Sequence, residues 1–144
     1  MERALQQARA AAARGEVPVG AVVTGPDGAV IAAAGNGVEA AQNPAAHAEM
    51  LVLEAARAAL GRRYLTDCTL TVTLEPCAMC AGAIAALRVG KLIFGAYDPK
   101  SGAVEHGPRI FSHPTTHHKP EVIGGVREDE ANALLRTFFA GLRG

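Results

Sequence analysis

The sequence is poor in several residue types, and each shortage excludes a class of protein. Its 144 residues contain no tryptophan, only 4% aromatic residues and three cysteines. An odd and small number of cysteines does not fit a disulfide framework. No apolar run approaches the ~18 residues that a transmembrane helix needs. We therefore expect a protein without disulfides and without a membrane partner.

A net charge is also lacking, because 14 Lys and Arg residues balance 14 Asp and Glu residues. A neutral chain has no global positive field, so any nucleic-acid partner depends on a local basic patch. The N-terminal stretch MERALQQARAAAARG carries charges through what would be the apolar part of a secretory signal. We expect that this stretch is not a signal and that the protein is cytoplasmic.

The composition that remains is typical of a folded domain, with 49% hydrophobic and 19% charged residues. A chain of this length buries roughly 68–70% of its unfolded surface, which is enough for a core without disulfides or other cross-links. We found no internal repeat, linker or low-complexity segment. The prediction is a single domain that spans residues 1–144.

Strand and helix signals alternate along the chain. Turn chemistry in GPDG predicts a β-hairpin over residues 17–36, and Asn43-Pro44 predicts a helix start. Further helices are expected over 2–14, 77–90 and 127–143, strands over 69–74, 91–96 and 120–126, and a long loop over 97–120. This order indicates an α/β fold, a three-layer α/β/α sandwich whose mixed central sheet of about five strands opens with the hairpin.

The stretch TLEPCAMCAG holds Cys77 and Cys80 in a C-x-x-C spacing directly after Pro76. Such a pair can be a redox dithiol, half of a closed structural zinc site, or part of a catalytic zinc site. A closed site would need a fourth protein ligand, for which Cys68 is the candidate, whereas a catalytic site leaves that position to water. Cys68 is expected at the far end of the intervening strand from Cys77.

His47 supplies the nitrogen ligand that would complete a catalytic set with the two thiolates. Cys77 and Cys80 fall at the opening of a predicted helix, where free amides and the helix dipole favour thiolates. His47 and Glu49 would point about 200° apart on a regular helix. They converge only if the metal lies beyond the end of that helix, so we expect two helix N-termini to face one Zn²⁺.

The pattern H-x-E followed by P-C-x-x-C is the known signature of zinc-dependent nucleobase deaminases. Zinc lowers the pKa of its bound water toward neutrality. Glu49, which is not a ligand, would take a proton from that water and deliver protons to the ring nitrogen and the departing ammonia. We therefore predict His47, Cys77 and Cys80 as metal ligands for one Zn²⁺ and Glu49 as the catalytic residue.

The resemblance extends beyond the zinc motif. The segments GEVPVGAVV, NPAAHAEM, TLEPCAMCAGAI, FGAYDPKSGA and LLRTFF come in the order seen in bacterial tRNA-specific adenosine deaminases, the TadA type. That resemblance covers nearly the whole chain and implies a cytidine deaminase-like fold, one zinc per subunit and a homodimer. It also implies hydrolytic deamination of adenosine to inosine at the wobble position of tRNA, with the anticodon stem-loop as partner.

The same resemblance implies substrate contacts. Asn36 resembles the family asparagine that hydrogen-bonds the nucleoside, Val17 and Pro18 resemble the pocket walls that sandwich the base, and the amide of Ala48 could reach the purine edge. Asp98 resembles a loop aspartate that contacts the neighbouring sugar, where an RNA 2′-hydroxyl is available. Each has a purely structural alternative: a turn asparagine, core residues, and a turn-forming aspartate.

Two features depart from the family pattern: the chain is electrically neutral, and its end, FFAGLRG, lacks a basic tail. We therefore expect a local basic patch and a steep salt dependence of tRNA binding. Candidate phosphate contacts are Arg62, Arg63, Arg88, Lys100, Arg109, Lys119 and Arg143.

The histidines of the long loop allow a second metal site or a polar surface near RNA or a partner subunit; these are His106, His113, His117 and His118. The alternative functions are a deaminase of free bases or nucleosides, such as guanine or cytosine, and a catalytically silent zinc-stabilised binding module.

Overall fold

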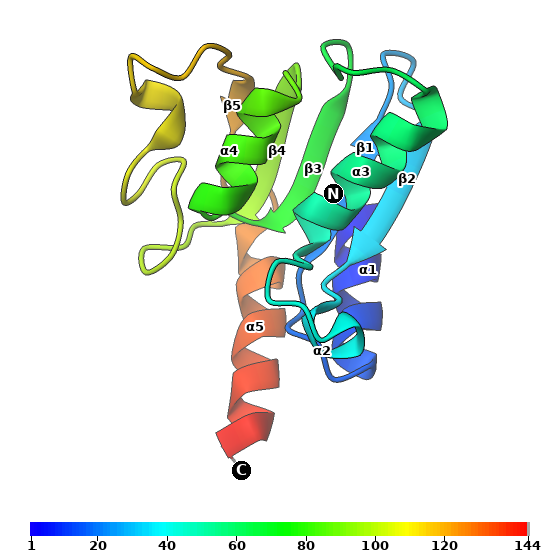
Figure 1. The fold of residues 1–144 in the computed structure, drawn as a ribbon. Coiled ribbons are helices and arrows are strands. Elements are labelled where there is room, and N and C mark those ends of the chain that lie inside the picture. The colour runs from blue at the N-terminus through cyan, green and yellow to red at the C-terminus, as the bar shows by residue number, and fades with distance from the viewer. Residues whose placement is uncertain (144) are drawn as a thin grey trace.

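A computed structural model describes residues 1–143 and shows a five-stranded sheet with helices on both faces (Figure 1). The strand order is β2-β1-β3-β4-β5, with bounds Gly20–Thr24 (β1), Val30–Gly35 (β2), Thr69–Leu74 (β3), Lys91–Ala96 (β4) and Glu121–Ile123 (β5). The hairpin β1–β2 and the pair β1–β3 are antiparallel, whereas β3–β4 and β4–β5 are parallel. The sheet is therefore mixed and opened by a hairpin, as the sequence predicts.

The helices form the two outer layers. One face of the sheet is covered by α3 and α4, and the other by α1 and α5 (Figure 1). Their bounds are Glu2–Ala13 (α1), Ala48–Leu60 (α3), Ala78–Ala86 (α4) and Glu128–Arg143 (α5), with a short α2 at Val38–Ala41 and a 3-10 turn at Ile110–Ser112. The predicted three-layer α/β/α sandwich is confirmed.

The core lies between the sheet and the α3–α4 layer. Leu70, Val72, Leu92 and Phe94 on the two central strands are fully buried and belong to one contiguous apolar cluster. On the other face, α1 lies so close to the sheet that a Cβ at Gly20 would come within 2.0 Å of the carbonyl oxygen of Ala4. A glycine at this strand position therefore lets α1 pack directly against the hairpin.

One expected helix boundary is wrong, and one short helix was not expected. The helix expected from Asn43-Pro44 begins only at Ala48. Asn43 instead closes a turn: its side-chain oxygen accepts the amide of Ala45, and its carbonyl accepts the amide of Ala46. Asn-Pro suits a turn as well as a helix start, because both use the same capping chemistry. The segment after β2 also contains α2, which the sequence analysis did not predict.

Within residues 1–143, none of the helices combines the length and the apolar character required to span a bilayer.

Candidate metal centre and active site

Two helix N-termini meet at the carboxyl end of β3. His47 is the N-cap residue of α3, with extended backbone angles of φ −69° and ψ 151°. Because His47 stands just outside the helix and Glu49 lies in its first turn, the two side chains are not forced apart by the helical period. This arrangement confirms the expectation that the metal group gathers beyond the end of the helix.

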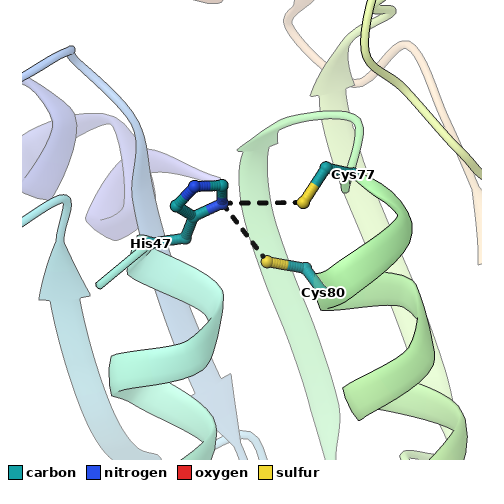
Figure 2. Close-up of side chains that lie close together, drawn as sticks. All are labelled: His47, Cys77 and Cys80. Carbon is teal, nitrogen blue, oxygen red and sulfur yellow. Dashed lines mark hydrogen bonds between the residues drawn. The ribbon is translucent and has the colours of Figure 1, made fainter. Parts of the chain in front are cut away.

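Cys77 takes the equivalent position on the facing helix, as the N-cap residue of α4, and Cys80 lies one turn on. The Nδ1 atom of His47 lies 3.6 Å from the Sγ atoms of both Cys77 and Cys80 (Figure 2). A tetrahedral zinc with Zn–N of about 2.0–2.1 Å and Zn–S of about 2.3 Å places nitrogen and sulfur about 3.6 Å apart. Both nitrogen–sulfur distances therefore match those around one tetrahedral zinc ion.

Cys68 does not belong to this group. It precedes β3, whereas Cys77 follows it, and the Cys68 thiol contacts Arg62 and Asp67 at the opposite end of that strand. Within residues 1–143, the one cluster of three or more His, Cys, Asp or Glu side chains that could hold a metal is His47, Cys77 and Cys80. A closed site that uses Cys68 as fourth ligand is thus excluded by the fold.

The two thiols differ in pKa. The hydrogen bond from Cys80 and the nearby His47 lower the pKa of Cys77 to about 5. The same bond, together with burial, raises the pKa of Cys80. A metal ion binds cysteine as the thiolate, so metal binding releases the thiol protons of the pair.

Glu49 is the buried carboxyl beside the metal group. Only 4% of its surface is exposed, and burial raises its pKa. Glu49, His47 and Cys77 line the same cleft, which has a volume of about 640 Å³. That size falls in the range of small-molecule sites. A buried carboxyl group therefore lies beside the candidate metal ligands, inside a cleft large enough for a nucleobase.

Asn36 also lines the cleft, and its side-chain oxygen is already occupied. Its Oδ1 accepts the amide N–H of Ala48, the first residue of α3, at 2.9 Å. A backbone N–H can only donate, so the Asn36 amide is oriented with its NH₂ group away from Ala48. Ala48 itself is fully buried and is not among the cleft-lining residues.

The other three candidate contacts, Val17, Pro18 and Asp98, differ in whether they line the cleft. Val17 lines the cleft, whereas Pro18 is buried behind it and does not. Asp98 lies at the rim beside Ser101, where its Oδ1 accepts the amides of Lys100 and Ser101 and thereby forms a turn. Both the structural and the functional interpretation of Asp98 are compatible with this geometry, because only one of its oxygens is occupied.

Several cleft residues were missed from the sequence. Glu16 is buried, and its carboxylate accepts the amides of Glu39 and Ala40, which lowers its pKa. Phe138, Phe139 and Leu142 reach the mouth of the cleft from the far end of α5, which extends beyond the sheet (Figure 1). The amphipathic pattern of α5 predicts a helix, but no local signal shows that its last turns overhang the cleft.

Glu75 is a further missed residue, and its carboxylate is enclosed by the loop that carries Asp98. Burial acts to raise its pKa, but hydrogen bonds from the amide of Asp98 and the ring of His106 outweigh that effect, and the pKa is lowered. Glu75 directly follows β3 and stands two residues before Cys77. Cys77 and the loop that carries Asp98 are therefore both attached to the short segment that follows β3.

The histidines of the long loop do not form a second metal group among residues 1–143. His106 bonds to Glu75, His113 to the carbonyl of Pro108, and His118 to the carbonyl of Val89.

Of the candidate phosphate contacts, Arg62 and Arg109 are in ion pairs with Asp67 and Glu105, and Arg88 lies over the ring of Tyr64. Lys100 and Arg143 are adjacent in sequence to residues that line the cleft.

Known proteins are similar to this chain in both sequence and fold. Residues 1–96 match the family described as the cytidine and deoxycytidylate deaminase zinc-binding region. A relative from Agrobacterium fabrum named tRNA-specific adenosine deaminase is 51% identical over 139 residues, which cover 96% of this chain and 91% of the relative. The chain belongs to the zinc-dependent cytidine and deoxycytidylate deaminase family.

Solved structures of similar deaminases extend the comparison. One, from a study of A-to-I editing by tRNA:A34 deaminases at the wobble position, has a TM-score of 0.91 and 50% identity, covering 94% of this chain and 97% of its own. Another, a guanine deaminase from Nitrosomonas europaea, has a TM-score of 0.78 and 30% identity, covering 96% and 82%. The expected cytidine deaminase-like fold is confirmed, and this deaminase is a zinc enzyme.

Proposed function

We propose that this enzyme deaminates adenosine to inosine at the wobble position of tRNA, with the anticodon stem-loop as substrate. The observation that carries the proposal is a zinc-ligand triad beside a buried glutamate in an open cleft, in a chain half identical to a tRNA-specific adenosine deaminase. The likeness to a guanine deaminase favours deamination of a free base as the second candidate.

His47, Cys77 and Cys80 would hold the zinc, which when bound makes a water molecule acidic enough to act as a nucleophile near neutral pH. The carboxylate of Glu49 accepts a proton from the attacking water and donates it to the ring nitrogen. It then accepts the remaining proton from the new hydroxyl on the tetrahedral carbon and donates it to the departing amine, as the carbon–oxygen double bond forms and the carbon–nitrogen bond breaks. Water and adenosine are consumed, inosine and ammonia are released, and Glu49 ends the cycle as it began.

Asn36 would bind the nucleoside as a donor. Its oxygen already accepts the amide of Ala48, and the opposite end of the side-chain amide is its NH₂ group. We assign the substrate contact to that group, which selects an acceptor atom. A purine ring offers such acceptors. A substrate contact to the Ala48 amide would compete with the bond to Asn36, so we assign this part of the recognition to the Asn36 amide, with Val17 forming the wall beside the base. Pro18 does not line the cleft and is assigned no contact.

Asp98 would contact the sugar next to the target. Its Oδ1 holds the turn at Lys100 and Ser101, and Oδ2 is left to accept a hydroxyl. A ribose 2′-hydroxyl is such a donor and distinguishes RNA from DNA. Comparing Asp98→Asn with Asp98→Ala tests this role: Asn keeps the turn acceptor and loses the charge, whereas Ala loses both.

A hairpin loop suits the site energetically. A base already unstacked in a loop inserts easily, whereas extracting a paired base costs a few kcal/mol. Phe138, Phe139 and Leu142 at the cleft mouth are apolar surfaces on which flanking bases can stack. Lys100 and Arg143 would hold phosphates. Binding of the stem-loop should weaken steeply as salt rises, and a flat response would contradict the local basic patch.

We further propose a homodimer of single-domain subunits in the cytoplasm. Exposed apolar side chains on the α3–α4 layer, Leu51 on α3 and Met79 on α4, support an interface there. Sedimentation equilibrium of the purified protein tests the dimer. A monomer at all concentrations would refute it.

The substrate is decided by incubating the zinc-loaded protein separately with an anticodon stem-loop, adenosine, guanine and cytosine. We expect inosine in the stem-loop and little ammonia from the free compounds. Turnover of a free base without inosine in the stem-loop would replace the proposal by its alternative. Glu49→Gln should keep zinc and lose ammonia release by orders of magnitude. An inactive parent protein that still binds zinc would favour the silent binding module.

A further inference from the structure

Among residues 1–143, Glu75 has no lysine or arginine partner, yet both of its carboxylate oxygens accept hydrogen bonds. Its side chain is completely buried. Oε2 accepts three consecutive backbone amides, those of Val104, Glu105 and His106, at 2.9–3.1 Å. Successive amides that converge on one oxygen form an anion-binding nest, which here encloses an anion belonging to the protein itself.

The other oxygen of Glu75 binds both ends of the same loop. Oε1 accepts the amide of Asp98 at 3.0 Å and the ring Nδ1–H of His106 at 2.8 Å. Residues 98–106 therefore close around a single carboxylate that makes five hydrogen bonds. We call this segment the Asp98 loop; it leaves β4 and passes beside α4 (Figure 1).

Close packing shows that the loop has little freedom while this carboxylate is in place. A Cβ at Gly102 would lie 2.5 Å from the Cδ atom of Glu75, so the loop backbone touches the carboxyl group. The amide of Ala103 also donates to the carbonyl of Pro76, between Glu75 and Cys77. The Asp98 loop is thus attached to the same short segment that supplies a zinc ligand.

We propose that Glu75 is a positioning residue that fixes the Asp98 loop, and with it the sugar-binding rim, at a set distance from the metal group. This inference rests on the proposed function, because the rim matters only if a nucleic-acid sugar binds there. Asp98 and Ser101 line the cleft together with Cys77. Glu75 holds Asp98 and Ser101 at the cleft already in the free enzyme. Substrate binding therefore does not have to order the loop.

The consequence is a separation between KM and kcat. Without the Glu75 carboxylate, the loop is ordered in only a fraction of the molecules. The apparent affinity for substrate then equals the affinity of the ordered form multiplied by that fraction. Hydrogen bonds to a charged group are strong enough for an effect of about tenfold to a hundredfold. The residues that perform the chemistry are not displaced, so kcat should stay within about twofold of the parent value.

The test compares Glu75→Gln, His106→Ala and the surface control Glu121→Gln in the zinc-loaded enzyme with an anticodon stem-loop. Glu75→Gln preserves size but replaces an acceptor oxygen by a donor that faces backbone amides. We expect KM to rise about tenfold to a hundredfold with zinc content and kcat retained. His106→Ala removes one of five bonds and should raise KM less, whereas Glu121→Gln, exposed on β5, should change nothing.

Hydrogen exchange provides a readout that does not depend on the substrate. The amides of Val104, Glu105 and His106 should be protected in the parent protein and exchange rapidly in Glu75→Gln. Unchanged KM and unchanged protection in an active Glu75→Gln enzyme would overturn the proposal, as would loss of zinc and kcat with KM unaltered. If Glu75→Gln does not fold, His106→Ala alone decides by the same criteria. A parent enzyme that forms no inosine in the stem-loop would instead refute the proposed function. The hydrogen-exchange result would still test whether Glu75 orders the Asp98 loop.

Discussion

Asn36 has two roles that a pair of substitutions can separate. Its Oδ1 accepts the amide of Ala48 at the N-terminus of α3, and its NH₂ group is free to donate to substrate. Asn36→Ala removes both functions. Asn36→Asp keeps an oxygen for the Ala48 amide and removes the donor. Stability and activity should therefore respond differently in the two variants.

The expected stability change follows from the burial of Ala48, which is fully inaccessible. Leaving a buried N–H without a partner costs about 1–3 kcal/mol. Because Asn36 lines an open cleft, water can partly replace it, so the lower half of that range applies to Asn36→Ala. This corresponds to a fall in Tm of about 3–6 °C for a domain of this size. The carboxylate in Asn36→Asp is favoured at a helix N-terminus, so its Tm should equal or exceed that of the parent.

Activity should fall in both variants, because each lacks the amide donor. We expect kcat/KM to drop about 10- to 100-fold in Asn36→Ala, and further in Asn36→Asp, since the carboxylate repels an acceptor atom of the ring. Circular dichroism suits the stability measurement, because the chain has no tryptophan. Parent activity in Asn36→Asp would refute the donor role, and a parent Tm in Asn36→Ala would refute the structural role.

Three further predictions concern the metal, pH and the core. Removal of zinc with a chelator should abolish activity and lower Tm, because the ion links the N-termini of α3 and α4. Zinc but not magnesium should restore both activity and Tm. Activity that survives complete zinc removal would contradict this prediction. The pKa of Glu16 is lowered in the folded protein by the amides of Glu39 and Ala40. Its stabilisation is thus present above the unfolded pKa and lost as pH falls through the lower folded pKa. Glu16→Gln should therefore be less stable than the parent at neutral pH, and this difference in stability should shrink in acid. Thermal melts of both proteins from neutral pH to about pH 3 measure the difference. A difference that does not change with pH would refute the lowered pKa of Glu16. Leu92→Ala should lose about 2–5 kcal/mol in denaturant unfolding, whereas the matched change at the more exposed Leu60 should be much milder, and equal losses would contradict the location of the core.

The metal group was predictable because its constraints are local. A C-x-x-C pair at a helix start places both sulfurs on one side of the first turn, and His47 with Glu49 can converge only past a helix end. The one local error, a helix start at Asn43, arose because an asparagine oxygen can cap a helix or close a turn. The structure uses the turn and leaves the N-cap position to His47 itself.

Glu75 could not be assigned from sequence because its partners are 23 to 31 residues away, in a loop with no periodicity. Glutamate before proline is compatible with an exposed loop as well as with a buried anion. The same limit applies to Phe138 and Phe139: the pattern of α5 predicts a helix, but their place at the cleft depends on how far that helix extends past the sheet. Long-range contacts of this kind are determined by packing and not by spacing.

The charges of the ligands and the direction of the helices are matched at the metal centre. Both α3 and α4 present their N-termini to it, and each such end has a partial positive charge that opposes a dication. Three neutral imidazoles would leave a doubly positive ion between two positive helix ends. Two thiolates cancel the charge of the ion and are themselves stabilised by the helix ends. The choice of Cys77 and Cys80 on one helix, with a single imidazole from His47 on the other, therefore follows from the fold that holds them.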